Sequence, residues 1–376
     1  MKAVVRAIDF PARGRLLAVS DVHGNLPWLK GLLERAAFSP EDALVLVGDL
    51  VEKGPESLAT LRYVMELSRT HTVHALCGNC DNLAVDFVWG GSGLDRDFYR
   101  YYLQVWGERS LIVQMAREAG LPAESPEDLP ALRSGLAERF APELRFLRDL
   151  PTILTAPGYV FVHGGVPSYD HMEELDAWRC MKNDDFMSQG YSFPKYCVVG
   201  HWPVTLYRTD YPCCNPIIDR KRKIISIDGG CVLKSDGQLN ALVIPEGDSR
   251  DFSWVSYDDC PVGVALDRQA ERADPVIIHW TDHDVEVLER GTEFSLCRHT
   301  ATGRTLPVLT KYLRRRGEQE WCEDTSDYRL AVEPGDRLSI VEETSRGRLV
   351  KKDGVTGWYF GRLKGPEREE KVQKSD

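Results

Sequence analysis

The stretch RLLAVSDVHGN, residues 15–25, contains the pattern that predicts the fold. A short apolar run typical of a buried strand is followed at once by Asp21 and His23, and then by apolar residues at helical spacing. A strand-like run that ends in an acid or an amide returns at ALVLVGD (43–49) and at VHALCGN (73–79). Strands that alternate with helices predict an α/β sheet whose chemistry lies at the C-terminal ends of the strands.

The rest of the first two thirds of the chain interrupts and then resumes this pattern. Residues 91–150 are rich in helix formers with apolar residues three and four apart, which predicts a helical insertion that covers one edge of the site. Further strand-like runs follow at 159–165, 195–201, 223–230 and 239–244. We therefore expect one catalytic domain over residues 1–250.

The C-terminal third has a different character. Residues 251–280 are polar and irregular and predict a linker, whereas residues 281–376 contain short strand-like pieces and predict a small all-β module with a disordered tail. The segment VKKDGVTGWYFGRLK (350–364) resembles a bacterial SH3-like domain. The matching residues of this barrel are Gly357, Trp358 and Tyr359. Such a barrel either binds a protein or peptide partner or packs its aromatic residues internally, and the sequence leaves both alternatives open.

Composition excludes several classes of protein. The chain carries 47 Lys and Arg against 58 Asp and Glu, a formal net charge of −11, which argues against general nucleic-acid binding. Its N-terminal segment has no uninterrupted apolar core of a secretory signal, and no stretch approaches the ~20 apolar residues of a membrane span. The 10 cysteines show no framework spacing. We therefore expect reduced thiols, no membrane contact and a cytoplasmic location.

The polar residues at the predicted strand ends form a set of oxygen and imidazole ligands. They are Asp21, His23, Asp49, Asn79, His163 and His201. Such ligands suit Mn, Fe or Zn, and two divalent ions about 3.5–4 Å apart need a bridging carboxylate. Asp49 has the central place in the series. Glycines beside nearly every ligand let the backbone come close to ions and phosphate oxygens.

The motifs around these ligands also carry a family resemblance. D-x-H-G-N, G-D-x-x-x-x-G-P, G-N-x-D, H-G-G and G-H-x-P occur in this order, and SIDGGCV (226–232) follows them. The series resembles the calcineurin-like metallophosphoesterases, and most closely the branch of Ser/Thr protein phosphatases and symmetrical diadenosine tetraphosphatases. The resemblance covers roughly residues 14–245. It implies a four-layer α/β/β/α sandwich with two divalent metal ions, Mn²⁺ before Fe or Zn.

The resemblance also implies a role for each ligand. One ion would be held by Asp21, His23 and Asp49, and the other by Asp49, Asn79, His163 and His201. A hydroxide that bridges the ions would attack phosphorus in line. Cations should then approach the phosphoryl oxygens, and Arg179 in AWRCMKND is our first candidate, with Lys53 second.

The sequence departs from this branch at three positions. Lys53 stands in EKG where protein phosphatases carry an Arg that clamps phosphate, and a Lys is only a point charge. Trp202 stands where Thr is common, and its indole would either stack on a substrate ring or pack. Cys80 stands where most members have the His that protonates the leaving group, with Asp81 expected to orient that acid.

The third departure affects the expected substrates. A thiol with a pKa near ~8.5 is a poor replacement for an imidazolium. Hydrolysis should be slowed less for leaving groups that need little protonation, such as nucleotide phosphates and aryl oxides, than for alkoxides. We expect a two-metal phosphohydrolase that resembles Ser/Thr protein phosphatases and acts on a phosphoprotein or a nucleotide. The alternatives are a nucleotide polyphosphate or phosphodiester hydrolase, or a weakly catalytic protein that binds partners through the barrel.

Overall fold

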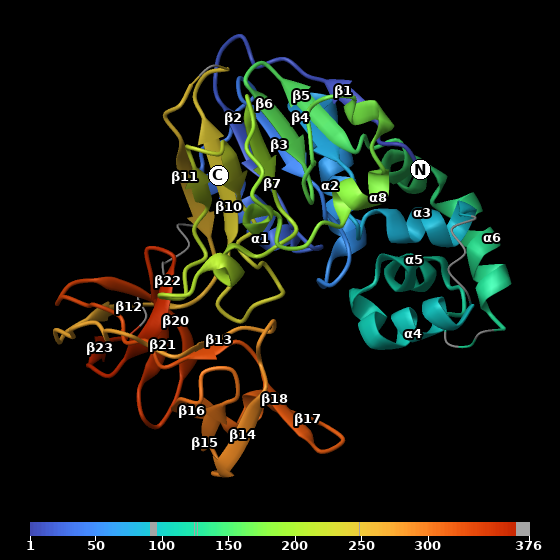
Figure 1. The fold of residues 1–376 in the computed structure, drawn as a ribbon. Coiled ribbons are helices and arrows are strands. Elements are labelled where there is room, and N and C mark those ends of the chain that lie inside the picture. The colour runs from blue at the N-terminus through green and yellow to red at the C-terminus, as the bar shows by residue number, and fades with distance from the viewer. Residues whose placement is uncertain (91–95, 124, 126, 248, 366–376) are drawn as a thin grey trace, which may run out of the picture. The chain divides into compact units, whose positions relative to one another are not determined.

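The structure is a computed structural model that describes residues 1–90, 96–123, 125, 127–247 and 249–365 (Figure 1). The chain forms two compact units. The first comprises 1–204, 215–233 and 237–258, and the second comprises 205–214, 234–236 and 259–376. The disordered tail predicted at the C-terminus lies outside the described residues.

The first unit contains a five-stranded mixed sheet. Its order is β11 (Ser253–Tyr257), β10 (Leu239–Ile244), β2 (Leu16–Val19), β3 (Ala43–Val47) and β4 (Thr72–Leu76). The last three strands are parallel, and β10 and β11 join them in antiparallel pairs. Because β2, β3 and β4 run in the same direction, the residues that follow them meet at one edge of the sheet.

A six-stranded mixed sheet belongs to the same unit. Its order is β1 (Val5–Ala7), β5 (Ile153–Ala156), β6 (Tyr159–Val162), β7 (Tyr196–Val199), β9 (Ile224–Ser226) and β8 (Ile217–Asp219). Here β6, β7 and β9 are parallel neighbours. The strands β1, β5 and β8 are short pieces that we did not predict from the sequence.

The two sheets pack face to face around one apolar core. Alternate residues of β3, such as Val45 and Val47, meet Phe161 of β6 and Val198 of β7 in this core. The other residues of β3, such as Leu44, pack on the helical layer instead. The strands are therefore apolar on both faces, which is why they appear in the sequence as continuous apolar runs.

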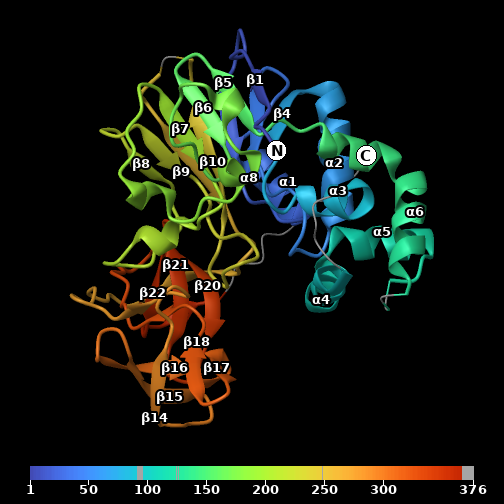
Figure 2. The same ribbon diagram turned by 45° about the vertical axis from the view of Figure 1, so that its right-hand side comes forward.

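Helices α1 (Leu26–Arg35) and α2 (Ser57–Thr70) contact the five-stranded sheet on its outer face. Further helices lie beside α2 and pack on one another, namely α3 (Asn82–Trp89), α4 (Arg96–Trp106), α5 (Leu111–Ala119), α6 (Leu129–Arg139) and α7 (Ala141–Arg148). Figure 2 shows α4, α5 and α6 beside α2 and α3, at the position expected for the helical insertion. Between β6 and β7 the chain supplies only α8 (Ala177–Met181) and short 3-10 turns, so the fourth layer is brief. The predicted α/β class is confirmed.

The second unit is all β. One antiparallel sheet has the order β22 (Val355–Tyr359), β21 (Arg348–Lys352), β20 (Arg337–Glu343), β12 (Val262–Ala265) and β23 (Leu363–Lys364). A second core lies under a three-stranded sheet of β14 (Val285–Glu289), β15 (Phe294–His299) and β16 (Thr305–Leu309). Two strand pairs complete it: β13 (Ile277–Ile278) pairs with β19 (Thr325–Ser326), and β17 (Leu313–Arg316) pairs with β18 (Gln319–Cys322). The SH3-like barrel stays a prediction.

The aromatic residues of the SH3-like motif lie inside the second unit. Trp358 is buried and its indole N–H donates to the carbonyl oxygen of Ser326 at 2.9 Å, and Tyr359 has no exposed surface. A Cβ on Gly357 would lie 2.8 Å from the ring of Tyr328. The structure thus favours the alternative in which these aromatic residues pack internally. Phe360, which follows them, is 49% exposed.

The structure differs from the linker expected over residues 251–280. This segment contains β11, β12 and β13, so little of it is free chain. The residues of β11, SWVSY, are half exposed because β11 is an edge strand, and this gave the sequence its polar appearance. Among the residues described, none of the helices is both long and apolar enough to cross a lipid bilayer.

Candidate metal centre

The predicted ligands follow strands that share one edge of the sandwich. Asp21 and His23 come after β2, and Asp49 comes after β3. His163 directly follows β6, and His201 comes after β7. Main-chain hydrogen bonds fasten these loops to one another, for example from the Asp21 amide to the Gly48 oxygen at 3.0 Å and from the Gly200 amide to the His163 oxygen at 2.9 Å.

Several of these residues hold a backbone conformation that L-amino acids rarely adopt. The φ angles of Asp21, His23, Asp49 and His201 are 55°, 49°, 52° and 66°. Left-handed conformations of non-glycine residues are unfavourable and collect at functional sites. Gly48 (φ 80°) contributes in another way, because a Cβ there would lie 2.6 Å from Nδ1 of His163.

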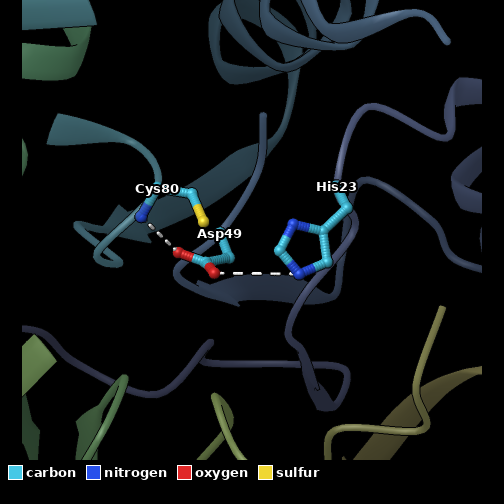
Figure 3. Close-up of side chains that lie close together, drawn as sticks. All are labelled: His23, Asp49 and Cys80. Carbon is cyan, nitrogen blue, oxygen red and sulfur yellow. Dashed lines mark hydrogen bonds and ion pairs between the residues drawn. The ribbon is translucent and has the colours of Figure 1, made fainter. Parts of the chain in front are cut away.

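Asp49 is at the centre of the cluster. Its Oδ2 lies 3.7 Å from Nε2 of His23, and its Oδ1 lies 3.3 Å from Nε2 of His163. Nε2 of His23 is also 3.6 Å from Oδ1 of Asp21. Figure 3 shows Asp49 between His23 and Cys80, so that one carboxylate faces groups from different loops. This is the arrangement that a bridging ligand requires.

The donor atoms fit divalent cations. Oδ1 of Asp21, Nε2 of His163 and Oδ1 of Asn79 are buried and have no hydrogen-bond partner among the described residues. Buried polar atoms are normally satisfied, because leaving them unpaired costs about 1–3 kcal/mol each. Two metal ions, one beside Asp21 and one beside Asn79 and His163, would satisfy these atoms. Two groups of possible ligands share Asp49, namely His23–Asp49–Cys80 and Asp21–Asp49–His163.

The pKa values of His23 and His201 suit this role, whereas the pKa of His163 keeps that ring protonated until a cation displaces the proton. Burial lowers the pKa of His23 to about 3, and burial together with the charge of His163 lowers the pKa of His201 to about 4. Both rings are therefore neutral near pH 7 and keep a lone pair for a cation. Burial would also lower the pKa of His163, but the carboxylates of Asp49 and Asp21 outweigh it and raise this pKa to about 10.

Lys53, our second candidate for a phosphate-contacting cation, lies at the cluster, and its contact with phosphate stays a prediction. Its Nζ is 3.5 Å from Nε2 of His23 and 3.9 Å from Oδ2 of Asp49. Burial alone would lower the pKa of Lys53, but contact with the sulfur of Cys80 and the carboxylates of Asp49 and Asp21 raise it, so the ammonium stays charged. Lys53 and the preceding Glu52 both have left-handed φ angles, 69° and 72°.

Glu52 is a buried residue whose role the sequence analysis missed. Its Oε2 accepts a hydrogen bond of 3.1 Å from the amide of Leu111 in α5, and Tyr102 of α4 lies close enough to affect the pKa of its carboxyl. Burial raises the pKa of this carboxyl to about 8. The Glu52 amide donates to Oγ of Ser57 at 2.9 Å. Glu52 therefore ties the loop that carries Lys53 to the helical insertion.

Asp81 has a different role from the one expected. Its Oδ2 accepts hydrogen bonds of 2.8 Å from the amides of Asp49 and Gly78, and its Oδ1 accepts from Leu50 at 2.8 Å and from Val51 at 3.3 Å. With both oxygens occupied by backbone amides, Asp81 shapes the loop of Asp49 rather than orienting an acid at position 80.

Cys80 lies in the cluster as a buried thiol. Its Sγ accepts a hydrogen bond of 3.3 Å from Nδ2 of Asn79, and its amide donates to Oδ1 of Asp49 at 2.8 Å. Burial, with the charge of Asp49, raises the pKa of Cys80 well above its usual value. Cys77 is also buried, and both cysteines are free thiols.

Two further residues were predicted to contact substrate, Arg179 and Trp202. Arg179 lies on α8 with an exposed side chain that forms no hydrogen bond or ion pair with any described residue, so its phosphate contact stays a prediction. Trp202 is only 9% exposed, which favours the packing alternative. Lys182, three residues after Arg179, has its Nζ 3.3 Å from Nε2 of His201, and the sequence analysis missed it.

Comparison with known proteins identifies the family of the chain. The sequence profile of the calcineurin-like phosphoesterases matches residues 14–221, which contain all the predicted ligands. The chain belongs to this family. A symmetrical bis(5'-nucleosyl)-tetraphosphatase from Klebsiella pneumoniae (strain 342) is 28% identical over 187 residues, which are 48% of this chain and 64% of that protein. A protein of the same name from Pseudomonas putida (strain W619) is 52% identical over 65 residues, 17% of this chain and 22% of that protein. The chain thus spans less than two thirds of the length of these relatives.

Solved structures show more distant likenesses. A protein serine/threonine phosphatase from Saccharomyces cerevisiae is 10% identical, with a TM-score of 0.42, and the match covers 68% of this chain and 84% of that one. A metallophosphoesterase from Sphaerobacter thermophilus is 21% identical, with a TM-score of 0.37, over 65% of this chain and 88% of that one.

Proposed function

We propose that the protein is a metal-dependent phosphohydrolase that binds two divalent ions, Mn²⁺ first among them, at the Asp49 cluster. The observation that carries this proposal is the convergence of unpaired, buried donor atoms from Asp21, Asn79 and His163 on one strained edge of the sandwich. Asp21, His23 and Asp49 would hold one ion, and Asp49, Asn79, His163 and His201 would hold the other. Divalent ions supply Lewis-acid charge and activate water as a nucleophile.

The chain's own residues support this chemistry. The Cys80 amide and the four amides bound by Asp81 fix the Asp49 carboxylate before any ion arrives. The ammonium of Lys53 adds positive charge within 4 Å of the cluster, where charge on phosphoryl oxygens would develop. Such fixed groups stabilise a transition state because they need no reorganisation during the reaction.

For the substrate we propose a dinucleotide polyphosphate rather than a phosphoprotein. The curated relatives named above are symmetrical bis(5'-nucleosyl)-tetraphosphatases. The buried thiol of Cys80, with its raised pKa, is a weak proton donor to a leaving oxygen. A nucleotide phosphate leaves with little protonation, whereas a serine alkoxide needs a proton. The second candidate, a Ser/Thr protein phosphatase, is favoured only by the shared ligand motifs.

The test is a side-by-side assay with added Mn²⁺. We expect hydrolysis of diadenosine tetraphosphate and of p-nitrophenyl phosphate, and at least tenfold lower kcat/KM on a phosphoserine peptide, since general acid catalysis contributes roughly 10²–10⁴-fold. Asp49→Asn should abolish activity on every substrate because the bridging charge is lost. Equal or better turnover of the phosphopeptide would reverse the substrate assignment. Full activity of the Asp49 variant, or after exhaustive chelation, would rule out the metal mechanism. Negligible turnover of every substrate by the wild type with Mn²⁺ would favour a weakly catalytic binding protein.

A further inference from the structure

The side chain of His201 is held by a residue outside the motifs of the sequence. Its Nε2 lies 2.8 Å from Oδ1 of Asp184, and the same oxygen accepts a hydrogen bond from Nζ of Lys182. Nζ of Lys182 also lies 3.3 Å from Nε2, and an ammonium only donates, so Nε2 has two contacts with opposite demands. The contact with Asp184 is the shorter one, and a carboxylate oxygen only accepts, so we place the ring proton of a neutral His201 on Nε2. Nδ1 then carries the lone pair and is the nitrogen left for a metal ion.

The position of Asp184 is fixed by the turn that carries His163. The Gly164 amide donates to the Cys180 oxygen at 2.8 Å, and a Cβ on Gly164 would lie 2.8 Å from the amide nitrogen of Asn183. The segment that leads to Asp184 therefore packs against the His163–Gly164 backbone with no room for a side chain. Nε2 of Gln189 closes the segment from the other side, with bonds of 2.8 Å to Oδ1 of Asn183 and 2.9 Å to the Asp184 oxygen.

His201 itself is fixed through its backbone. Its amide donates to Oδ2 of Asp21 at 3.0 Å, and its φ of 66° is in the left-handed region. The backbone thus places the ring beside His163, with ring centroids 5.1 Å apart. These backbone contacts do not fix the side-chain torsion angles of His201. The bond to Asp184 restricts them.

We propose that Asp184 is a positioning residue that orients His201 and selects the tautomer in which Nδ1 binds the metal. Carboxylates bonded to the second nitrogen of a ligating histidine fix its orientation and raise its basicity. The inference rests on the proposed function and concerns only the ion that His201 would hold. Lys182 shares the carboxylate but would not ligate a cation, which makes it the natural control.

The experiment measures Mn²⁺ binding by calorimetry in the full-length protein. We expect Asp184→Ala to weaken one of two Mn²⁺ sites by about 10–100-fold and to leave the other within twofold. Asp184→Asn keeps an oxygen acceptor and should lie between the wild type and the Ala variant. Lys182→Met should bind Mn²⁺ at least as tightly as the wild type, because a positive charge beside the ligand is removed. Equal weakening in the Lys182 variant would mean that Asp184 acts only by holding Lys182, and would overturn the proposal.

A second readout needs no metal. The ¹⁵N chemical shifts of His201 in the metal-free protein should report the Nε2–H tautomer in the wild type and a mixture of tautomers in Asp184→Ala. Asp184 is about half exposed, and thermal melts should show both Asp184 variants folded. Unchanged Mn²⁺ affinity and tautomer in Asp184→Ala would disprove the positioning role. If the wild type itself bound no Mn²⁺, the proposed function would fail instead, so the two failures are distinguishable.

Discussion

The amide of Cys80 donates a hydrogen bond of 2.8 Å to Oδ1 of Asp49, the carboxylate at the centre of the candidate metal site. This bond comes from the backbone, so it does not depend on which side chain stands at position 80. The thiol is a separate matter, since its Sγ accepts from Nδ2 of Asn79. The two functions of residue 80 can therefore be tested independently.

Cys80→Ser should leave hydrolysis of nucleotide and aryl substrates within about threefold of the wild type, because the backbone bond to Asp49 persists and a hydroxyl also accepts from Asn79. Cys80→His should raise turnover of alkyl phosphates by less than the roughly 10²–10⁴-fold of an evolved acid. The oxygens of Asp81 are engaged by backbone amides, so Asp81 is not free to orient the new imidazole. The check is a plot of kcat/KM against leaving-group pKa. If Cys80→Ser loses activity on aryl substrates, the thiol acts directly in the reaction.

Asp81→Asn should destabilise the protein and disturb the metal site together. The new amide group would face backbone N–H donors that now have a carboxylate oxygen as acceptor. An unsatisfied buried group costs about 1–3 kcal/mol, so the melting temperature should fall by several degrees. Mn²⁺ affinity should fall as well, because the Asp49 loop is no longer fixed. Asp86→Asn, on the neighbouring α3, is the matched control and should change neither quantity. A stable Asp81→Asn variant with normal Mn²⁺ affinity would contradict this role.

The sequence predicted the parts of the site that depend on strand ends. Asp21, Asp49 and His163 directly follow or lie within two residues of continuous apolar strands, and parallel pairing brings such positions together. What the sequence could not show is where side chains point once the loops turn. Asp81 accepts hydrogen bonds from backbone amides rather than orienting the side chain of Cys80. Lys182 rather than Arg179 approaches His201. Both outcomes depend on contacts between segments far apart in the chain.

The dependence on contacts between distant segments also explains why the sequence did not show where the first unit ends. The strand β11 lies at the edge of its sheet and none of its residues is fully buried, so its sequence resembles a linker. The segments 205–214 and 234–236 also belong to the second unit although the residues between them belong to the first. A chain that crosses between units in this way leaves no composition change to mark the boundary.

A fragment that ends at residue 250 should therefore be less stable than one that ends at residue 258. The longer fragment keeps β11, whose Ser256 carbonyl accepts a hydrogen bond of 2.9 Å from Arg35 and whose Tyr257 packs under the guanidinium of that arginine. It also keeps Phe252 in the core between the sheets. We expect the shorter fragment to melt several degrees lower or to be insoluble, as measured by scanning fluorimetry. Equal melting temperatures would show that β11 contributes nothing to the first unit.

The last prediction concerns the pH dependence of Glu52. Burial raises the pKa of its carboxyl from 4.5 to about 8 in the folded protein. Between these values the unfolded chain has lost the proton and the folded chain keeps it, so the free energy of unfolding falls as the pH rises, by at most about 1.4 kcal/mol per pH unit. The loss is complete above pH 8, and stability from this group is fully present below pH 4.5.

Glu52→Gln mimics the protonated form and cannot ionise, and its oxygen can still accept from the Leu111 amide. The melting temperature of this variant relative to the wild type should therefore increase steadily from pH 5 to pH 8, measured with a chelator so that no metal ion alters the charge of the site. Glu108→Gln, an exposed glutamate of the same insertion that pairs with Arg117, should show no such trend. A Glu52→Gln difference that is constant across this range would mean that the carboxyl is already ionised in the folded protein, and that a charged group accepts the bond from α5.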